Sequence, residues 1–216
     1  GGWVAWNRIP LENIDRIEMV RGGGSGIWGN LARGGVGNIL TERPRKRSIR
    51  FMAEGGNEGT ANLNFFSADR EGPWSYSWGG RYYDTDGQYL VREDQRGSAD
   101  LRSYVQHESF MGRLAYDLSP RSSLYVRGSY YDEDRGKGTP IGHSGTVSRS
   151  YGAGADLAAE DGSEWDLNLF TTFQTYDNRT GRVARDRNSE TPSTVQYDVP
   201  SSSMGANLQW SKKVGA

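Results

Sequence analysis

The sequence predicts an all-β fold in which antiparallel strands form part of a barrel that crosses a lipid bilayer. Three observations predict it. From Ser48 onward, segments of about ten residues alternate polar and apolar side chains with a period of two, the period of a strand. Tight turns and long polar stretches alternate between these segments, and aromatic residues gather at the segment ends.

The composition excludes several other classes of protein. The 216 residues carry a formal net charge of −1, which argues against a nucleic-acid-binding protein with a basic surface. Seven Trp, twelve Tyr and six Phe argue against intrinsic disorder, which depletes aromatic residues. Cysteine is absent, which excludes disulfides and thiolate metal sites in this sequence. No stretch approaches 18 apolar residues, so no transmembrane helix is expected.

The N-terminal region differs from the rest, and the boundary lies near Pro44. Between Arg8 and Arg43, glycine-rich stretches surround two apolar strands with the sequences IDRIEMVR and GGVGNILT. A basic linker, RPRKR, follows at residues 43–47. The sequence begins Gly1-Gly2-Trp3 without an initiator Met or a signal peptide, and we interpret it as an internal piece of a longer protein.

Eight strands are predicted after the linker, and no helix. They are residues 49–53, 61–65, 74–83, 110–118, 122–132, 151–157, 165–174 and 204–210. In each segment one face carries no charge. Leu124, Val126 and Tyr130, for example, fall on the opposite face from Arg127. Strands of this length match a tilted bilayer crossing, whereas soluble strands are commonly about five or six residues long.

The connections indicate which end of each strand faces which side of the membrane. The stretches 70–73, 119–122 and 160–163 are tight turns, whereas 85–106, 133–148 and 178–197 are long and polar. Outer-membrane barrels have short periplasmic turns and long extracellular loops. The short turn at 57–59 departs from this rule. Since alternation alone does not identify the environment of a strand, a soluble β-sandwich is the alternative fold.

Aromatic residues sit where two interfacial girdles would require them. Trp74 and Trp165 are next to tight turns. The aromatic residues next to the long stretches are Tyr82, Tyr83, Tyr130, Tyr131 and Tyr176.

No motif for catalysis or cofactor binding is complete in this sequence. Residues 24–29 match G-x-G-x-x-G, but the residues that follow are too glycine-rich for the helix that a dinucleotide site needs. His107 and His143 have no third ligand at metal spacing, and the acidic stretches 84–87 and 132–134 do not complete a calcium loop. No Ser/His/Asp set or carboxylate pair stands out. We therefore predict no enzymatic activity, no cofactor and no metal site.

The N-terminal region carries a specific motif. It reads IDRIEMVRG at residues 14–22, followed by Ser25, Trp28-Gly29, Gly34-Gly35-Val36 and the NILT of residues 38–41. This closely resembles the end of the plug domain of TonB-dependent outer-membrane receptors, whose pattern is I-E-R-I-E-V-x-R-G-P-x-S-x-x-[YW]-G followed by A-x-G-G-V-I-N-I-x-T. The resemblance covers residues 9–44. Gly23 stands where the family often has Pro, and Gly37 where it usually has Ile, which we expect to loosen the last plug strand slightly.

The resemblance implies a role for each motif residue. The plug-motif residues are Arg21, Gly22, Ser25, Trp28, Gly29, Gly34, Gly35 and Asn38. We expect the glycines at 22, 29, 34 and 35 to serve turns with positive φ and close strand approach. Arg21 resembles the plug arginine that the family buries against barrel carboxylates, and we expect its partner in barrel strands outside this sequence.

The domain organisation follows from these two regions. Residues 1–44 are interpreted as the C-terminal part of a plug, and residues 45–216 as the N-terminal portion of a transmembrane barrel. A small barrel is filled by its own side chains, so a plug demands a wider barrel, of the plugged 22-stranded kind. About eight strands alone would leave open edges in lipid, where each unpaired backbone group costs several kcal/mol. We expect that this chain neither functions nor inserts on its own.

The expected function is TonB-dependent active import across the bacterial outer membrane. The ligand is expected to be a scarce nutrient, a ferric siderophore first and otherwise cobalamin, haem or a glycan. The partners would be this chelate, the lipid bilayer and the TonB complex, which the family contacts through an N-terminal box that this sequence lacks; no nucleic acid is involved. Tyr89, Tyr104 and His143, in the predicted loops, are candidate ligand contacts. An outer-membrane barrel lipase or protease and a secreted glycan-binding β-sandwich are the alternatives.

Overall fold

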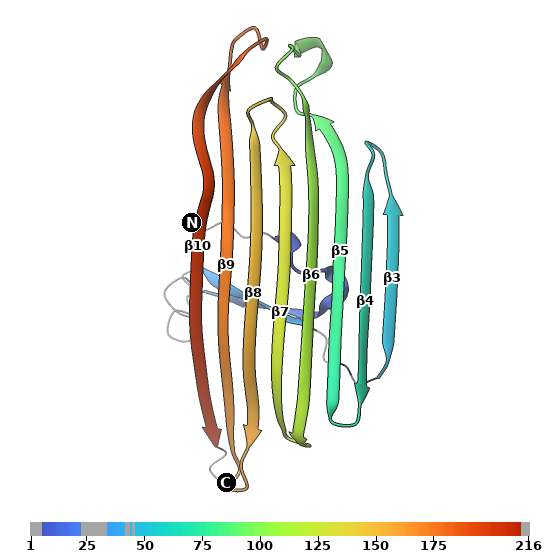
Figure 1. Ribbon diagram of the computed structural model, residues 1–216, viewed down its shortest axis with the longest axis vertical. Coiled ribbons are helices and arrows are strands. Elements are labelled where there is room, and N and C mark those ends of the chain that lie inside the picture. The colour runs from blue at the N-terminus through green and yellow to red at the C-terminus, as the bar shows by residue number, and fades with distance from the viewer. Residues whose placement is uncertain (1–5, 23–33, 42–43, 45, 213–216) are drawn as a thin grey trace.

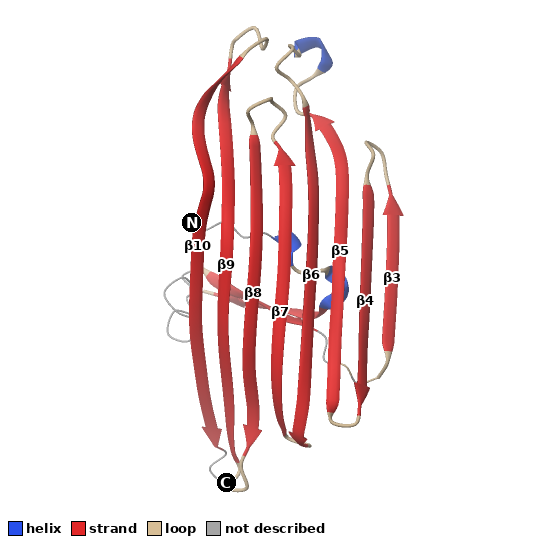
Figure 2. Cartoon of the chain, viewed as in Figure 1, coloured by secondary structure: helices blue, strands red, loops and turns tan. Residues whose placement is uncertain are grey.

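The computed structural model describes residues 6–22, 34–41, 44 and 46–212, and within them the chain is almost entirely β-strand (Figures 1 and 2). Two strands, β1 (Ile14–Arg21) and β2 (Gly35–Thr41), form an antiparallel ribbon. The other eight form one antiparallel sheet in which each strand pairs with its neighbours in sequence. Searched over these residues, the chain contains no helix with the length and apolarity needed to cross a membrane.

The eight-stranded sheet runs in sequence order from β3 to β10. Its strands are β3 (Ser48–Gly55), β4 (Ala61–Glu71), β5 (Trp74–Tyr89), β6 (Arg102–Ser119), β7 (Ser122–Gly136), β8 (His143–Ala158), β9 (Ser163–Val183) and β10 (Glu190–Lys212). Three single-turn 3-10 helices complete the described elements: η1 (Trp6–Arg8), η2 (Leu11–Asn13) and η3 (Glu93–Gln95). The predicted all-β fold and all ten predicted strands are confirmed, and the sheet is open, as expected for part of a barrel.

The long polar stretches were predicted wrongly as loops. Strands β5 to β10 extend far into them, so the connections are only residues 90–101, 137–142 and 184–189. Both faces of these extensions are polar, so the sequence shows no alternation there even though the backbone ladder continues. Asp134, for instance, pairs with Gln106 on one side and Gly145 on the other. The strands are therefore longer than the nine to eleven residues that the apolar pattern suggested.

The two faces of the sheet differ as the alternation predicted. We call the face against which residues 6–13 pack the inner face, and the opposite one the outer face. On the outer face Trp78, Leu114 and Leu124 are 42%, 43% and 43% exposed. On the inner face their neighbours Ser77 and Ala115 are 5% and 3% exposed. The uncharged face therefore points away from the protein.

Two aromatic groups bound the apolar part of the outer face. At the end with tight turns, the ring centres of Trp74 and Tyr116 are 4.8 Å apart. Toward the other end, Trp78 lies 6.3 Å from Phe110. Beyond them the outer face becomes charged, because Glu108 pairs with Asp132. From the level of Trp74 to that of Gly80, the partner of Phe110, is six residues, about 20 Å along the strand.

The short turn between β3 and β4 lies at the same end of the sheet as the longer connections, but lower (Figure 1). It is short because β3 and β4 have 8 and 11 residues and lack the polar extensions of their neighbours. Glu58 and Gly59 turn the chain with φ of 59° and 66°. The Asp86 amide donates a hydrogen bond of 2.9 Å to the Glu58 carbonyl, which fastens the turn to β5.

Candidate functional site

The candidate site is the inner face of the sheet together with residues 6–13, which pack on it and which we call the N-terminal segment. The Arg8 guanidinium donates a hydrogen bond to the Gln174 side chain on β9 and lies 5.9 Å from the ring centre of Tyr131 on β7. Asn13 is 2% exposed and lies so close to Gly79 that a Cβ at position 79 would overlap its side chain. The segment is thus attached to several strands by a few polar and steric contacts.

A further attachment joins the segment to β3. The Arg50 guanidinium donates a hydrogen bond of 2.7 Å to the Glu12 carbonyl oxygen, and Arg50 Nε lies 3.6 Å from Glu12 Oε2. The same guanidinium lies 4.2 Å from the ring centre of Phe66 on β4. Polar and cation–π contacts of this kind tolerate water at their edges, unlike a packed apolar core.

A cluster of aromatic and charged side chains lies on the inner face next to η1, because Arg8 of η1 lies against Tyr131. His107 stacks on Tyr83 with ring centres 5.2 Å apart, and Tyr131 lies 6.1 Å from His107 on its other side. The Tyr131 hydroxyl donates to Glu133 at 2.8 Å, and Arg135 donates to the same carboxylate at 2.9 Å. His107 and Tyr131 are each 2% exposed. This cluster links the N-terminal segment to the polar ends of the strands.

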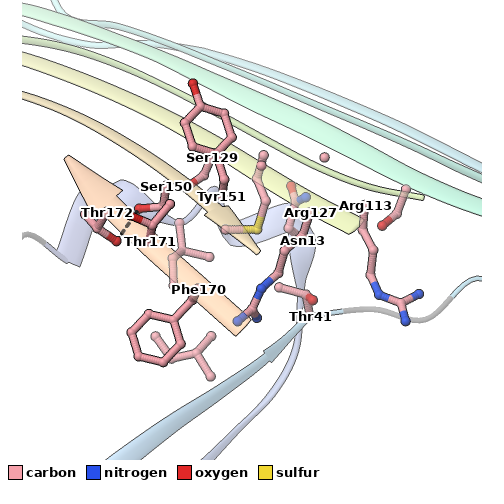
Figure 3. Close-up of a pocket in the computed structure, with 16 residues that line it drawn as sticks. Asn13, Thr41, Arg113, Arg127, Ser129, Ser150, Tyr151, Phe170, Thr171 and Thr172 are labelled. Carbon is pink, nitrogen blue, oxygen red and sulfur yellow. Dashed lines mark hydrogen bonds between the residues drawn. The ribbon is translucent and has the colours of Figure 1, made fainter. Parts of the chain in front are cut away.

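A cavity of about 260 Å³ lies between the N-terminal segment and the inner face (Figure 3). Ile9, Asn13, Ile39 and Thr41 line it from the N-terminal side. From the sheet it is lined by Ser77, Met111, Gly112, Arg113, Arg127, Gly128, Ser129, Ser150, Tyr151, Phe170, Thr171 and Thr172. Hydroxyl groups and two guanidinium groups therefore dominate its polar lining. Among the described residues no group of three or more His, Cys, Asp or Glu is placed to hold a metal ion.

Two of the connections are joined by a buried ion pair at the far end of the strands. Arg187 donates to both carboxylate oxygens of Asp100, with Nε to Oδ2 at 2.8 Å. The Asp100 side chain is only 3% exposed, and the hydrogen bonds from Arg187 and from the Gly97 amide lower the pKa of Asp100 from 3.8 to about 2. The Ala99 amide donates to the Arg187 carbonyl at 2.9 Å.

The connection at residues 137–142 is hydrogen-bonded to the neighbouring residues of the other two connections. The Glu190 carboxylate accepts hydrogen bonds from the Thr139 hydroxyl at 2.7 Å and from the Ile141 amide at 2.8 Å. The Leu101 amide donates to the Gly138 carbonyl at 2.9 Å. Connections 90–101, 137–142 and 184–189 are therefore held together by hydrogen bonds and by one bidentate ion pair, and we call them the joined loops.

The candidate ligand contacts lie near the joined loops but away from the inner face. The Tyr104 hydroxyl donates to Asp134 at 3.2 Å, and His143 Nε2 meets the other oxygen of the same carboxylate. The side-chain alternation of β6 and β8 places Tyr104 and His143 on the outer face. Tyr89 lies separately, with the guanidinium of Arg96 4.0 Å from its ring centre.

The described plug-motif residues lie on or beside the β1–β2 ribbon. Gly22 and Gly35 have φ of +90° and +148°, as expected. The same expectation is wrong for Gly34, which precedes the extended strand β2 and has no positive φ. Arg21 is exposed at the end of β1, and its expected carboxylate partner stays a prediction. Ser25, Trp28 and Gly29 lie outside the described residues.

The remaining motif positions lie in the ribbon ladder. The Asn38 amide donates to Glu18 at 3.5 Å, across the pair that these residues form. Strand β2 continues through Gly37, which pairs with Met19, so the expected loosening does not interrupt the strand.

Three features of the site were not predicted from the sequence: Arg8, the cavity arginines and the Asp100–Arg187 pair. The last joins residues 87 positions apart, and no local pattern connects them. Arg113 and Arg127 were visible only in part. Counting outward from the tight turn at 119–122 places Arg113 opposite Gly128, and the register shift between Asp117 and Ser119 brings it opposite Arg127 instead.

Comparison with known proteins identifies relatives of the chain, although no family model matches it. The probable TonB-dependent siderophore receptor PirA of Acinetobacter baumannii is 30% identical over 132 residues, covering 56% of this chain and 17% of that protein. The vitamin B12 transporter BtuB of Photobacterium profundum is 34% identical over 134 residues, covering 61% of this chain and 22% of that protein. The chain is related to TonB-dependent receptors.

Solved structures of such receptors share its fold. The crystal structure of PirA matches 94% of this chain and 32% of its own, with a TM-score of 0.65 and 16% identity. The ferripyoverdine receptor of the outer membrane of Pseudomonas aeruginosa matches 80% of this chain and 25% of its own, with a TM-score of 0.65 and 16% identity. The chain spans about a fifth of the curated relatives it matches, and those relatives are receptors and transporters rather than enzymes.

The Asp100–Arg187 pair predicts how the joined loops respond to acid. Because the folded pKa of Asp100 lies below its ordinary 3.8, the pair stabilises the loops fully above about pH 4, and this contribution is lost as the pH falls through about 2. In the intact protein we expect proteolysis of residues 90–101 and 184–189 to stay slow at pH 5 and to accelerate in Asp100→Asn.

The matched control is Asp94→Asn, which removes an exposed carboxylate of the same loop. It should leave proteolysis at the wild-type rate. Equal rates for Asp100→Asn and wild type would show that the pair does not hold the loops together.

Proposed function

We propose that this chain is the C-terminal part of a plug (residues 1–44) and the first eight strands of the barrel (residues 45–216) of a receptor that imports a scarce ligand across a bacterial outer membrane. One observation carries the proposal. Residues 6–13, which directly precede the plug-motif ribbon, pack on the polar inner face of a sheet whose outer face is apolar and exposed. That arrangement suits a stopper inside a lipid-embedded wall, and it does not suit a soluble sandwich, whose apolar face would be packed.

The inner face supports a transport role. A ligand that moves between plug and wall meets hydroxyl, amide and guanidinium groups, which exchange hydrogen bonds with water and ligand at little net cost. The N-terminal segment is attached through Arg8, Asn13 and Glu12 rather than through a large apolar interface. Such contacts can break when the plug is pulled, and we propose that the TonB complex supplies this pull through an N-terminal box.

A ferric siderophore is the proposed ligand. Relatives include a siderophore receptor and a metal-pseudopaline receptor, the latter from Pseudomonas aeruginosa, which is 28% identical over 155 residues. A vitamin B12 transporter is also among them, so cobalamin is the second candidate. Tyr89, Tyr104 and His143 stay candidate contacts, and the inner cluster of Tyr83, His107 and Tyr131 faces the route that the ligand would take.

Growth under iron limitation tests this function directly. A strain that lacks the intact parent gene should grow more slowly than its parent strain on at least one ferric chelate from a panel of siderophores, and the complete gene should restore growth. Cobalamin-dependent growth of the same strains tests the second candidate. Equal growth of both strains on every chelate and on cobalamin would contradict import of these ligands. Hydrolase activity of the purified receptor would favour the barrel-enzyme alternative.

A disulfide between the plug and the wall should block import. In Asn13→Cys/Gly79→Cys the new sulfur would occupy the place of Asn13 Cγ, 3.0 Å from the Cβ position at residue 79, which suits a disulfide. We expect the oxidised full-length receptor to bind its chelate but to lose uptake, and reduction to restore uptake.

The single variant Asn13→Cys is the control and should transport under both conditions, since it leaves Gly79 unchanged. Undiminished uptake by the oxidised double variant, with the disulfide verified by mass spectrometry, would show that the ligand passes without separation of these two residues.

A further inference from the structure

Arg8, the last residue of η1, is held by a row of three inner-face residues that we call the socket. Tyr131 on β7 pairs with Ser148 on β8, and Ser148 pairs with Gln174 on β9. The Arg8 guanidinium donates a hydrogen bond to the Gln174 side chain and lies 5.9 Å from the ring centre of Tyr131. Ser148, the small residue between them, is only 3% exposed. The ladder thus places an aromatic ring, a short side chain and an acceptor side by side, where one guanidinium contacts both ends of the row.

The socket lies between the cavity and the end of the sheet with the joined loops. Along β7, Ser129 lines the cavity, Tyr131 belongs to the socket, and Glu133 lies two residues, about 7 Å, nearer to the joined loops. On the neighbouring strands Ser150 and Thr172, whose hydroxyl oxygens are 3.0 Å apart, line the cavity two residues from the socket (Figure 3). The guanidinium in the socket therefore stands between the cavity and the end from which a ligand would enter.

The groups that hold Arg8 are neutral. Gln174 offers an amide oxygen and Tyr131 a ring face, and Arg8 Nε is buried without a hydrogen-bond partner among the described residues. In contrast, the joined loops are held by Asp100, which accepts two hydrogen bonds from Arg187. A bidentate bond between two ionised groups is stronger than a single bond to a neutral amide, and separating a buried ion pair leaves uncompensated charge. The attachment of Arg8 is therefore the easier of the two to break.

We propose that Arg8 is a release latch. Seated in the socket, it closes the passage between the cavity and the joined loops, and it must leave the socket before a ligand can pass along the wall. The inference rests on the proposed function, and it names the contact of the N-terminal segment that controls the route. Opening needs little free energy, because water replaces the Gln174 oxygen as the acceptor for the guanidinium.

The socket keeps its shape when the latch opens. The Tyr131 hydroxyl donates to Glu133 at 2.8 Å, and the Tyr131 ring centre lies 6.1 Å from that of His107. These contacts come from the wall alone, so they persist without Arg8. The ring is therefore in place when the N-terminal segment returns, and the latch can close again.

Hydrogen exchange of the backbone amides of residues 6–13 in the full-length receptor tests the latch. The purified receptor is kept in detergent at pH 7.5 without ligand, and the amides exchange when the segment opens from the wall. Arg8→Gln removes the charge-assisted hydrogen bond and should speed exchange on the order of tenfold. Arg8→Lys keeps the charge but loses the planar fork, and its rate should fall between those of Arg8→Gln and wild type.

Gln174→Glu should have the opposite effect. It preserves the shape of the acceptor and adds a negative charge, so Arg8 gains an ion pair and exchange should slow on the order of tenfold. A merely structural role of Gln174 would instead predict faster exchange. The slowing should disappear in Arg8→Gln/Gln174→Glu, and it should weaken in about 1 M sodium chloride.

The matched control is Gln196→Glu, which should exchange at the wild-type rate. It adds the same charge on β10, where Gln196 pairs with Asn178. Asn178 lies four residues, about 13 Å, along β9 from Gln174, so the added charge is out of reach of Arg8. On any ferric chelate of the growth panel that the wild-type receptor imports, Gln174→Glu should slow growth and Gln196→Glu should not.

The proposal is overturned if Arg8→Gln leaves exchange unchanged, or if Gln174→Glu exchanges as fast as Gln196→Glu. It is also overturned if Gln174→Glu slows exchange but not growth on an imported chelate. Failure of the proposed import function is a separate result. A receptor that supports no growth on any chelate but shows both exchange effects would keep the contact and lose the transport role. A receptor that imports a chelate without these effects would keep the transport role and lose the latch.

Discussion

The continuous antiparallel ladder from β3 to β10 is the constraint on which the structure depends. Backbone groups within a bilayer need internal hydrogen bonds, and the ladder supplies them strand by strand. Because side chains alternate across a strand, the same ladder fixes which residues meet lipid and which meet the N-terminal segment. A register shift of one residue would place Arg127 in lipid and Val126 against the cavity, so the register determines the chemistry of both faces.

The N-terminal segment uses that inner face in two ways. Its contacts through Arg8, Asn13 and Glu12 hold it in place, while the cavity beside them leaves polar space between segment and wall. The wall is therefore both a support for the segment and the surface that a ligand would follow. At the far end of the strands, hydrogen bonds and an ion pair hold the three joined loops together. The end from which a ligand would enter is therefore ordered before any ligand arrives.

Much of the fold was predictable from the sequence, and the site much less so. Local alternation identified every strand, and the motif of residues 14–22 and 34–41 identified the ribbon, because both signals lie within short stretches. The strand extensions escaped prediction because their two faces are equally polar. Asp100 and Arg187, and likewise Arg8 and Gln174, are joined only by the folded chain, so spacing could not reveal them. Arg113 and Arg127 show the intermediate case, because a register shift next to the turn changes their pairing by one residue.

The central claim is that the outer face of the sheet meets lipid and the inner face meets the plug. Spin labels at residues 123–127 of the full-length receptor in lipid vesicles test it most directly, through their collision rates with oxygen, which partitions into the bilayer, and with a water-soluble nickel complex. We predict a period of two, with labels at Leu124 and Val126 accessible to oxygen and labels at Ser123, Tyr125 and Arg127 shielded from it. Uniform accessibility, or oxygen access at the odd-numbered positions, would contradict the claim.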